Sequence, residues 1–328
     1  MEVVLEHLSH SPGWEEREVI AARQASSSEV QLAHPESHFE AVRSMAERGG
    51  GWMDGDTPVS PGSLETALEA VGGAITAVDS VLDGRPGGRV FALIRPPGHH
   101  ATVDQAMGFC LFNNAAIAAR YAIERYGLDR VAIVDWDVHH GNGTQDILWS
   151  DPAVLFISLH QWPLYPGSGW LDETGEGAGE GLTVNLPMPP GSGDLEYLAA
   201  IDSIVLPILG QYDPQLVIVS AGQDGHHDDP LSHQELTTAG YRALASRLSG
   251  FAGELEVPLV ALHEGGYNLE TLPRLDRAIL DGLAATPEDG PEVSGYPGPA
   301  GGSINGDWEE RAGQVVAVQG RYWKLPAP

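Results

Sequence analysis

Two carboxylates and two imidazoles follow an apolar run in the segment VAIVDWDVHHGNG, residues 131–143. In an extended chain Asp137 and His139 point the same way, because side chains alternate with a period of two. Asp135 shares their parity but lies deeper in the run, which favours a hydrogen-bonding role behind them. A catalytic zinc ion usually takes three such protein ligands and leaves a position for water. Such residues also cluster in surface turns, but their place after a buried run favours a metal site.

Similar polar groups follow other apolar runs of the chain. They are RPPGHH (95–100), His160, GQDG (222–225) and HEGGY (263–267). The carboxyl ends of parallel strands meet at one edge of an open α/β sheet, where ligands bind. We therefore expect these groups to converge in space, and Asp224 could then complete a set of two carboxylates and one imidazole with Asp137 and His139.

His99 and His100 follow Pro-Pro-Gly, which stiffens their approach to the same crevice. An imidazole can act there as a general base and acid, although paired loop histidines are often only solvated or structural. Tyr267 follows two glycines, which allow the backbone to approach a ligand closely. Its phenol could then donate a hydrogen bond to that ligand; alternatively, Tyr267 is an aromatic that packs in a turn. We expect His226, His227 and His233, in an acidic loop, to be solvated; the alternative for His226 and His227 is a place at the rim of the site.

Strand–helix alternation predicts the elements that must position these groups. Helical stretches (113–127 and 194–210 among them) lie between the apolar runs, and their alternation predicts an α/β layered fold with a mostly parallel sheet flanked by helices. We assign residues 1–284 to one domain, 285–307 to a Gly/Pro-rich connection, and 308–328 to a closing helix on the same domain. The predicted strands cover 89–94, 130–135, 153–159, 182–187, 215–221 and 258–263.

The composition limits the classes of partner. The 17 basic and 46 acidic residues give a net charge of −29, which repels nucleic acid. No stretch approaches the roughly 20 apolar residues that cross a bilayer, and no signal peptide is recognisable. The single cysteine, Cys110, excludes an internal disulfide framework and is typical of a reducing cytosol, so we expect a cytoplasmic protein; a homo-oligomer is left open.

Six ordered motifs over roughly residues 50–284 resemble the zinc-dependent histone deacetylase superfamily, which has the arginase/deacetylase fold, and specifically its bacterial class II-like members. The motifs are RPPGHHA (95–101), GFCLFNNAAIAA (108–119), VDWDVHHGNGTQD (134–146), SLHQ…YPGSG (158–169), SAGQDGHHDDPL (220–231) and HEGGYN (263–268). One departure is that the family's N-terminal strand and His-Pro-Glu loop are not recognisable in residues 1–20; either the start is truncated or the site is unusually open.

The resemblance implies a role for each matching residue. The metal ligands correspond to Asp137, His139 and Asp224, and the catalytic residues to His99, His100, Tyr267 and Asp135. His100 matches the proton shuttle, His99 its electrostatic partner, Asp135 the carboxylate behind His99, and Tyr267 the phenol that donates to the substrate carbonyl. Asn142 stands where some relatives place a second aspartate.

The resemblance also implies a narrow acyl-lysine tunnel and a second, monovalent ion. The tunnel and its rim correspond to Gly108, Phe109, Tyr165, Leu231 and Asp56. Tyr165 stands where phenylalanine is common, and Leu231 where polyamine-selecting relatives carry a glutamate. A K⁺ or Na⁺ ion is implied beside Asp135, Asp137, His139, Ser158 and Leu159.

The implied activity is removal of acetyl or other short acyl groups from lysine side chains or related amines by zinc-activated water. Partners would be an acyl-lysine peptide or protein, or an acetylated polyamine. An acetylpolyamine amidohydrolase and a non-catalytic acyl-ligand binding protein remain alternatives, whereas an arginase-like two-manganese site would need a D-x-H-x-D pattern. Two carboxylates and one imidazole accept iron or cobalt as well as zinc.

Overall fold

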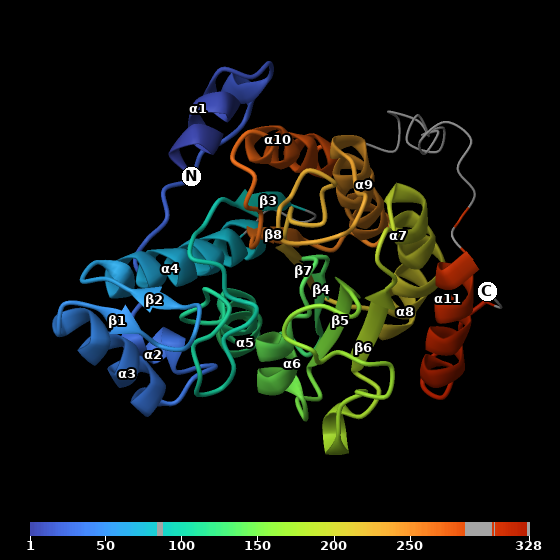
Figure 1. Ribbon diagram of the computed structural model, residues 1–328, viewed down its shortest axis with the longest axis horizontal. Helices are drawn as coiled ribbons and strands as arrows, with labels where there is room; N and C mark the ends of the chain where they lie inside the picture. The colour runs from blue at the N-terminus through green and yellow to red at the C-terminus, as the bar shows by residue number, and fades with distance from the viewer. Residues whose placement is uncertain (84–87, 286–303, 305, 327–328) are drawn as a thin grey trace.

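A six-stranded parallel sheet forms the centre of the protein in a computed structural model that describes residues 1–83, 88–285, 304 and 306–326 (Figure 1). The strand order is β3-β8-β7-β4-β5-β6, and every pairing is parallel. The strands are β3 (Arg89–Ala92), β4 (Val131–Asp135), β5 (Val154–Gln161), β6 (Thr183–Met188), β7 (Leu216–Ala221) and β8 (Leu259–His263). All six predicted strands are therefore present, and the predicted α/β class is confirmed.

Alternate residues of the central strands enter two separate cores. In β4, Val131 and Ile133 pack into one core, whereas Ala132 and Val134 pack into the other. Both sets are buried because helices cover both faces of the sheet. This explains why the strands read as continuous apolar runs without polar alternation.

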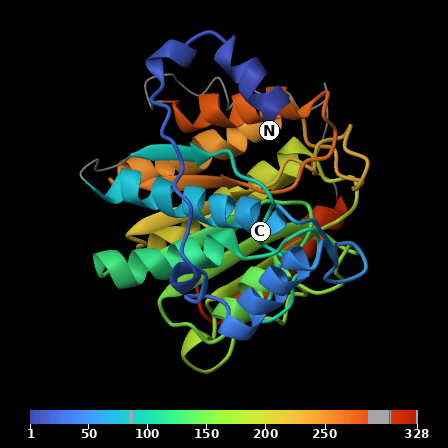
Figure 2. The same cartoon turned by 90° about the vertical axis from the view of Figure 1, so that its left-hand side faces the viewer.

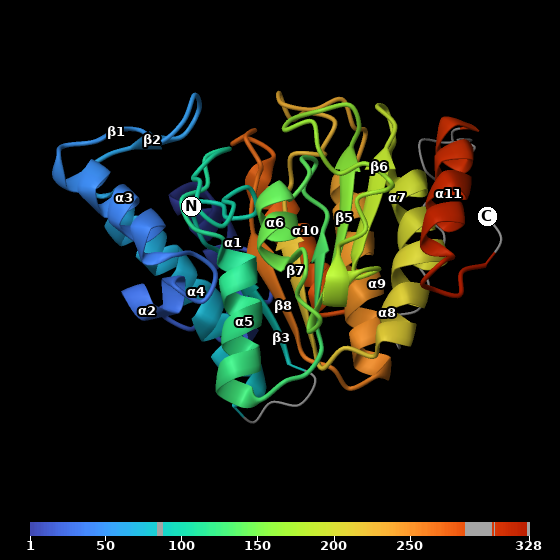
Figure 3. The same ribbon diagram turned by 90° about the horizontal axis from the view of Figure 1, so that it is seen from below.

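The helices form a layer on each face (Figure 3). One layer contains α4 (Ser63–Leu82) and α5 (Asn114–Tyr126), which contribute to the first core, with α6 (Asn142–Leu148) beside it. The other contains α7 (Asp194–Ala200), α8 (Leu206–Tyr212), α9 (Thr238–Glu254) and α10 (Leu272–Leu283). None of the helices in the described ranges is long and apolar enough to cross a membrane.

The N-terminal region was not assigned elements from the sequence. It forms α1 (Glu2–Ser9), which packs against α10, and an extended segment that runs down one side of the molecule (Figure 2). Between and after these come η1 (Trp14–Glu16), α2 (Ser27–Val30), α3 (Glu36–Glu47) and the hairpin of β1 (Gly51–Trp52) and β2 (Pro58–Val59). The hairpin bears on the site, because Asp56 and Thr57 accept the backbone N–H groups of Gly108 and Phe109.

Two segments differ from the predicted boundaries, and one loop contains a short helical turn. The predicted helix at 194–210 is interrupted by a π-helical turn, η3 (Ile201–Val205), because Pro207 has no N–H to continue the regular ladder. The closing helix α11 spans Gly306–Gln319 and packs on β6 through the second core. The Gly-rich stretch 168–181 contains only the short turn η2 (Gly177–Gly179). Most of the predicted connection at 285–307 lies outside the described residues.

Candidate active site

Asp137, His139 and Asp224 converge at the carboxyl edge of the sheet. Oδ1 of Asp137 and Oδ2 of Asp224 each lie 3.1 Å from Nδ1 of His139. All three side chains are buried, and their potential ligand atoms lie within 4.8 Å of one another. The two loops that carry them follow the adjacent strands β4 and β7. The three side chains therefore converge, as expected for residues that follow the carboxyl ends of parallel strands.

Backbone groups and glycines hold the carboxylates in place. Gly265 donates its N–H to Oδ2 of Asp137 over 2.9 Å, and Val138 donates its N–H to Oδ1 of Asp224 over 3.0 Å. A Cβ on Gly265 would lie 2.2 Å from Oδ2 of Asp224, and one on Gly222 would lie 2.1 Å from Oδ2 of Asp137. The positions therefore require glycine, because the backbone itself forms the wall of the candidate metal site.

The electrostatics of this set favour a cation. Although burial alone lowers the pKa of His139, the side chains of Asp137 and Asp224 raise it to about 10. Two buried carboxylates thus stabilise a positive charge placed between them. A divalent ion supplies that charge more compactly than an imidazolium, so the donor set fits the metal that the resemblance implies.

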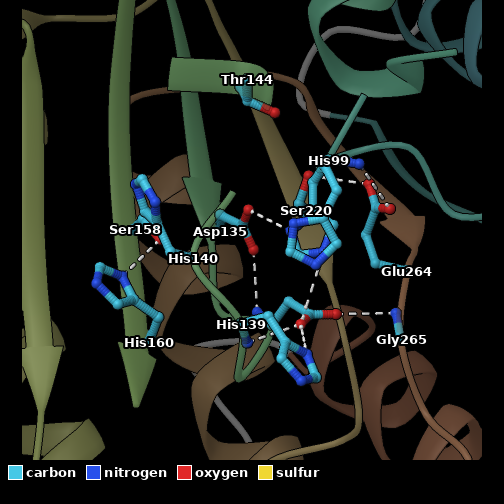
Figure 4. Close-up of polar contacts among 12 residues, drawn as sticks. His99, Asp135, His139, His140, Thr144, Ser158, His160, Ser220, Glu264 and Gly265 are labelled. Carbon is cyan, nitrogen blue, oxygen red and sulfur yellow. Dashed lines mark hydrogen bonds and ion pairs between the residues drawn. The ribbon is translucent and has the colours of Figure 1, made fainter. Parts of the chain in front are cut away.

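His99 and His100 lie side by side, with ring centroids 4.0 Å apart, but have different partners. Asp135 accepts a hydrogen bond from Nδ1 of His99 over 2.9 Å (Figure 4). His100 has its Nδ1 2.7 Å from Oδ1 of Asn142, while the amide nitrogen of Asn142 lies 3.4 Å from Sδ of Met107. The carbonyl oxygen of Asn142 can only accept, so Nδ1 of His100 carries the proton and Nε2 carries the free lone pair.

Charge separates the two histidines further. Burial lowers the pKa of His99, but the charges of Asp137 and Asp135 raise it well above its usual value. Burial and the neighbouring charges of His99 and His139 hold the pKa of His100 well below its usual value. His99 is therefore the cationic member of the pair and His100 the neutral one, poised to accept a proton.

Tyr267 is positioned by a carboxylate that the sequence reasoning missed. Asp229 accepts the Tyr267 N–H over 2.7 Å through Oδ2 and the Leu231 N–H over 3.0 Å through Oδ1. Burial raises the pKa of the Tyr267 phenol, so it keeps its proton. Its ring lies 5.7 Å from that of Phe109. The acidic run DDPL was the only sequence signal for Asp229, and this run does not predict a hydrogen bond to the backbone of Tyr267.

Phe109 and Tyr165 are partly exposed near the histidine pair and Tyr267, with 38% and 36% of their surfaces exposed. The Tyr165 ring meets that of His100 edge-on at 5.0 Å. Gly108 and Phe109 both have positive φ, and their N–H groups donate to Asp56 and Thr57 of the hairpin over 3.0 and 3.1 Å. Asp56 therefore supports the backbone of Gly108, whereas the rim position expected for it stays a prediction.

The residues expected around a monovalent ion also lie together in the sheet. Asp135 and Ser158 are paired in register on β4 and β5, and Leu159 follows Ser158; all three are buried. The hydroxyl of Ser158 lies 3.0 Å from Nδ1 of His160, and Asp135 also accepts the Asp137 N–H over 3.0 Å. These contacts place His160 behind the site rather than in the metal set.

Glu264 is a second residue to which the sequence assigned no role. Its carboxylate accepts the N–H groups of Gly98 and His99 over 2.6 and 3.3 Å and a hydrogen bond from Ser220 over 3.2 Å (Figure 4). Burial raises its pKa to about 7. Glu264 thus fixes the backbone that presents the histidine pair. Its position after a buried strand was the available signal.

Cys110 is buried, and burial raises the pKa of its thiol well above the usual value, which disfavours the reactive thiolate form. The expectation that His226 is solvated is wrong, because its surface is only 3% exposed. The backbone of His226 bridges to Leu236, which closes the loop over the ring.

Comparison with known proteins identifies the family. The histone deacetylase domain matches residues 1–283. A probable deacetylase of Archaeoglobus fulgidus is 44% identical over 262 residues, which are 79% of this chain and 72% of the relative. A histone deacetylase-like amidohydrolase of Pseudomonas aeruginosa is 41% identical over 267 residues, 80% of this chain and 70% of the relative.

A solved structure shows the same fold. The crystal structure of the HDA15 HD domain superposes with a TM-score of 0.86 at 35% sequence identity, covering 98% of this chain and 87% of that domain. The parallel sheet, the polar groups at its carboxyl edge and these similarities all indicate the same family. The chain belongs to the histone deacetylase domain family of deacetylases and amidohydrolases.

Proposed function

We propose that the chain is a zinc-dependent hydrolase that removes acetyl or other short acyl groups from lysine side chains. The observation that carries this proposal is the free Nε2 lone pair of His100, whose ring lies 5.8 Å from the ring of His139 in the candidate metal set. Besides burial, the charges of Asp224 and Asp137 in that set help to raise the pKa of the Tyr267 phenol. A general base, a cation site and a hydrogen-bond donor are what amide hydrolysis by water requires.

Asp137, His139 and Asp224 would hold the zinc ion. When bound, a zinc ion supplies Lewis-acid polarisation of the substrate carbonyl and acidifies water. The fit rests on the two buried carboxylates and the pocket's preference for a positive charge. The buried oxygens near Asp135 and Ser158 would hold a K⁺ or Na⁺ ion behind the site.

The chain's own groups would carry out the proton transfers. Nε2 of His100 accepts a proton from the attacking water and later donates it to the leaving amine. His99, held by Asp135, adds positive charge near the oxyanion. The Tyr267 phenol donates a hydrogen bond to the carbonyl oxygen, and one well-placed donor of this kind contributes about 2.7–4 kcal/mol to transition-state stability.

Two partly exposed aromatic side chains support a linear acyl-lysine substrate. Phe109 and Tyr165 would line its path to the candidate metal set, and their aromatic surfaces suit the aliphatic stem of lysine. Leu231, 41% exposed, adds a further apolar surface on a neighbouring loop. An acetylated polyamine is the second candidate, favoured by the net charge of −29 and by the carboxylates of Asp54 and Asp56 in the hairpin.

The test is turnover of an acetyl-lysine heptapeptide and of acetylputrescine by the purified chain. We expect kcat/KM to be higher on the peptide, and His100→Ala to abolish both activities while His10→Ala, at the exposed N-terminal helix, retains them. Preference for acetylputrescine would support the second candidate. Unchanged turnover in His100→Ala, or no hydrolysis of either substrate by the metal-loaded chain, would exclude the hydrolase mechanism.

A further inference from the structure

A second group of potential metal ligands lies in the loop after β7, outside the candidate active site. Within the described ranges only two groups of three His, Cys, Asp or Glu side chains bring ligand atoms within 4.8 Å of one another; one is the active-site set and the other is His226, His227 and Asp228. Oδ2 of Asp228 lies 3.6 Å from Nε2 of His227 and 4.0 Å from Nδ1 of His226.

The hydrogen bonds of the two imidazoles fix which nitrogens carry a lone pair rather than a proton. His227 Nδ1 lies 3.1 Å from the carbonyl oxygen of Leu236, which can only accept, so Nδ1 carries the proton and Nε2 the lone pair. The Asp228 N–H donates to Nδ1 of His226 over 3.2 Å, so that nitrogen also carries a lone pair. Both nitrogens nearest the Asp228 carboxylate are thus in the form that binds a metal.

The surroundings combine a fixed ligand with an open face. His226 is buried, and its ring stacks on that of His227 at 4.1 Å. The side chains of His227 and Asp228 are 41% and 51% exposed. The bond from His227 to the Leu236 carbonyl orients the ring from behind, as carbonyl partners do at many metal-binding histidines. An ion could therefore enter from solvent and keep water in its remaining positions.

We propose that Nδ1 of His226, Nε2 of His227 and the Asp228 carboxylate form a second divalent-metal site, separate from the candidate catalytic one. Two imidazoles and one carboxylate select a transition metal of the Zn²⁺, Ni²⁺ or Co²⁺ type over Mg²⁺ or Ca²⁺, which prefer oxygen ligands. The ion replaces the Asp228 N–H at His226 and draws the carboxylate inward.

This loop also contacts the segment that carries Tyr267. The Asp228 carbonyl oxygen accepts a hydrogen bond from the Asn268 amide over 2.8 Å, and Asp229 accepts the Tyr267 N–H. A metal that draws Asp228 toward the imidazoles therefore changes the support of the tyrosine. Occupation of the second site is expected to lower turnover without displacing the ion held by Asp137, His139 and Asp224.

Metal stoichiometry tests the proposal without depending on catalysis. The tag-free chain, loaded with one equivalent of zinc, is titrated with Ni²⁺ by calorimetry, and we expect a second equivalent to bind. His227→Gln and Asp228→Asn should each weaken nickel binding by about tenfold or more. The matched control is His233→Gln, an exposed histidine of the same loop, which should bind as the wild type does.

The outcomes separate this site from the hydrolase proposal. Binding of one metal equivalent only, or nickel binding unchanged in His227→Gln, overturns the second site whatever the turnover. Equal weakening in His233→Gln indicates adventitious binding by surface histidines and also overturns it. If the second equivalent binds but turnover on acetyl-lysine peptide stays constant, the link to Tyr267 is wrong. Absence of hydrolysis by the chain with one equivalent of zinc bound, before nickel is added, would contradict only the proposed function.

Discussion

Replacing Asn142 with aspartate tests how His100 is kept neutral. The Asn142 carbonyl oxygen lies 2.7 Å from Nδ1 of His100 and offers a hydrogen bond without a full charge. Burial and the charges of His99 and His139 then hold the pKa of His100 well below its usual value. Asn142→Asp keeps the shape and the acceptor but adds a negative charge at that contact.

The expected size of the effect follows from the geometry. Two unit charges about 4 Å apart interact with about 4 kcal/mol at an effective dielectric constant near 20. This energy corresponds to about 3 pKa units, since one unit is about 1.36 kcal/mol. Desolvation of the new carboxylate opposes the gain, so we expect the pKa of His100 to rise by about 1–3 units.

The pH profile of kcat/KM on an acetyl-lysine peptide measures this shift. A general base must be unprotonated, so activity falls as the pH decreases through the pKa of His100. Raising that pKa moves the acid limb of the profile toward higher pH by the same amount. The rate lost at low pH should be regained at higher pH.

Asn142→Ala is the control for the loss of the hydrogen bond alone. It removes the contact without adding charge, so it should lower kcat but leave the acid limb in place or move it slightly downward, because the Asn142 bond itself raises the pKa of His100. If Asn142→Asp folds and binds metal but its acid limb coincides with that of the wild type, His100 is not the general base.

Three other substitutions test separate parts of the site. Tyr267→Phe should lower kcat by about 10²–10³-fold with metal affinity unchanged; equal loss of metal in elemental analysis would contradict its donor role. Gly265→Ala should release the metal, because its Cβ would lie 2.2 Å from Oδ2 of Asp224, whereas Gly250→Ala, with open space around it, should retain the ion; metal retained by both variants would refute the backbone wall. Cys110→Ala should keep most of its turnover, since burial suppresses the thiolate; complete inactivation with the fold intact would reopen a thiol mechanism.

The sequence predicted the sheet well because each central strand is buried on both faces. The predicted strand at 130–135 became β4, Val131–Asp135, and the strand at 215–221 became β7, Leu216–Ala221. The same reasoning predicted that Asp137 and Asp224 converge, since adjacent parallel strands end at one edge. It could not foresee the π-helical turn Ile201–Val205, which depends on how the helix accommodates Pro207.

Contacts between distant loops were beyond the sequence. Asp229 supports Tyr267 from 38 residues away, and Glu264 binds the backbone of His99 across 165 residues. The alternation of apolar and polar residues and the spacing of motifs describe only local geometry. Neither of these two long-range contacts can therefore be predicted from them. His226 was misjudged for the same reason: an acidic loop reads as solvated, but the bridge to Leu236 closes it. The roles of the site residues remain predictions that rest on this geometry.

The most direct measurement of the central claim is metal depletion and reconstitution of the purified chain. A chelator should abolish hydrolysis of an acetyl-lysine peptide, and the first added equivalent of zinc should restore it in the wild type but not in Asp224→Asn. Full turnover by the metal-free chain, or restoration of Asp224→Asn to wild-type activity by one zinc equivalent, would contradict a catalytic ion held by Asp137, His139 and Asp224.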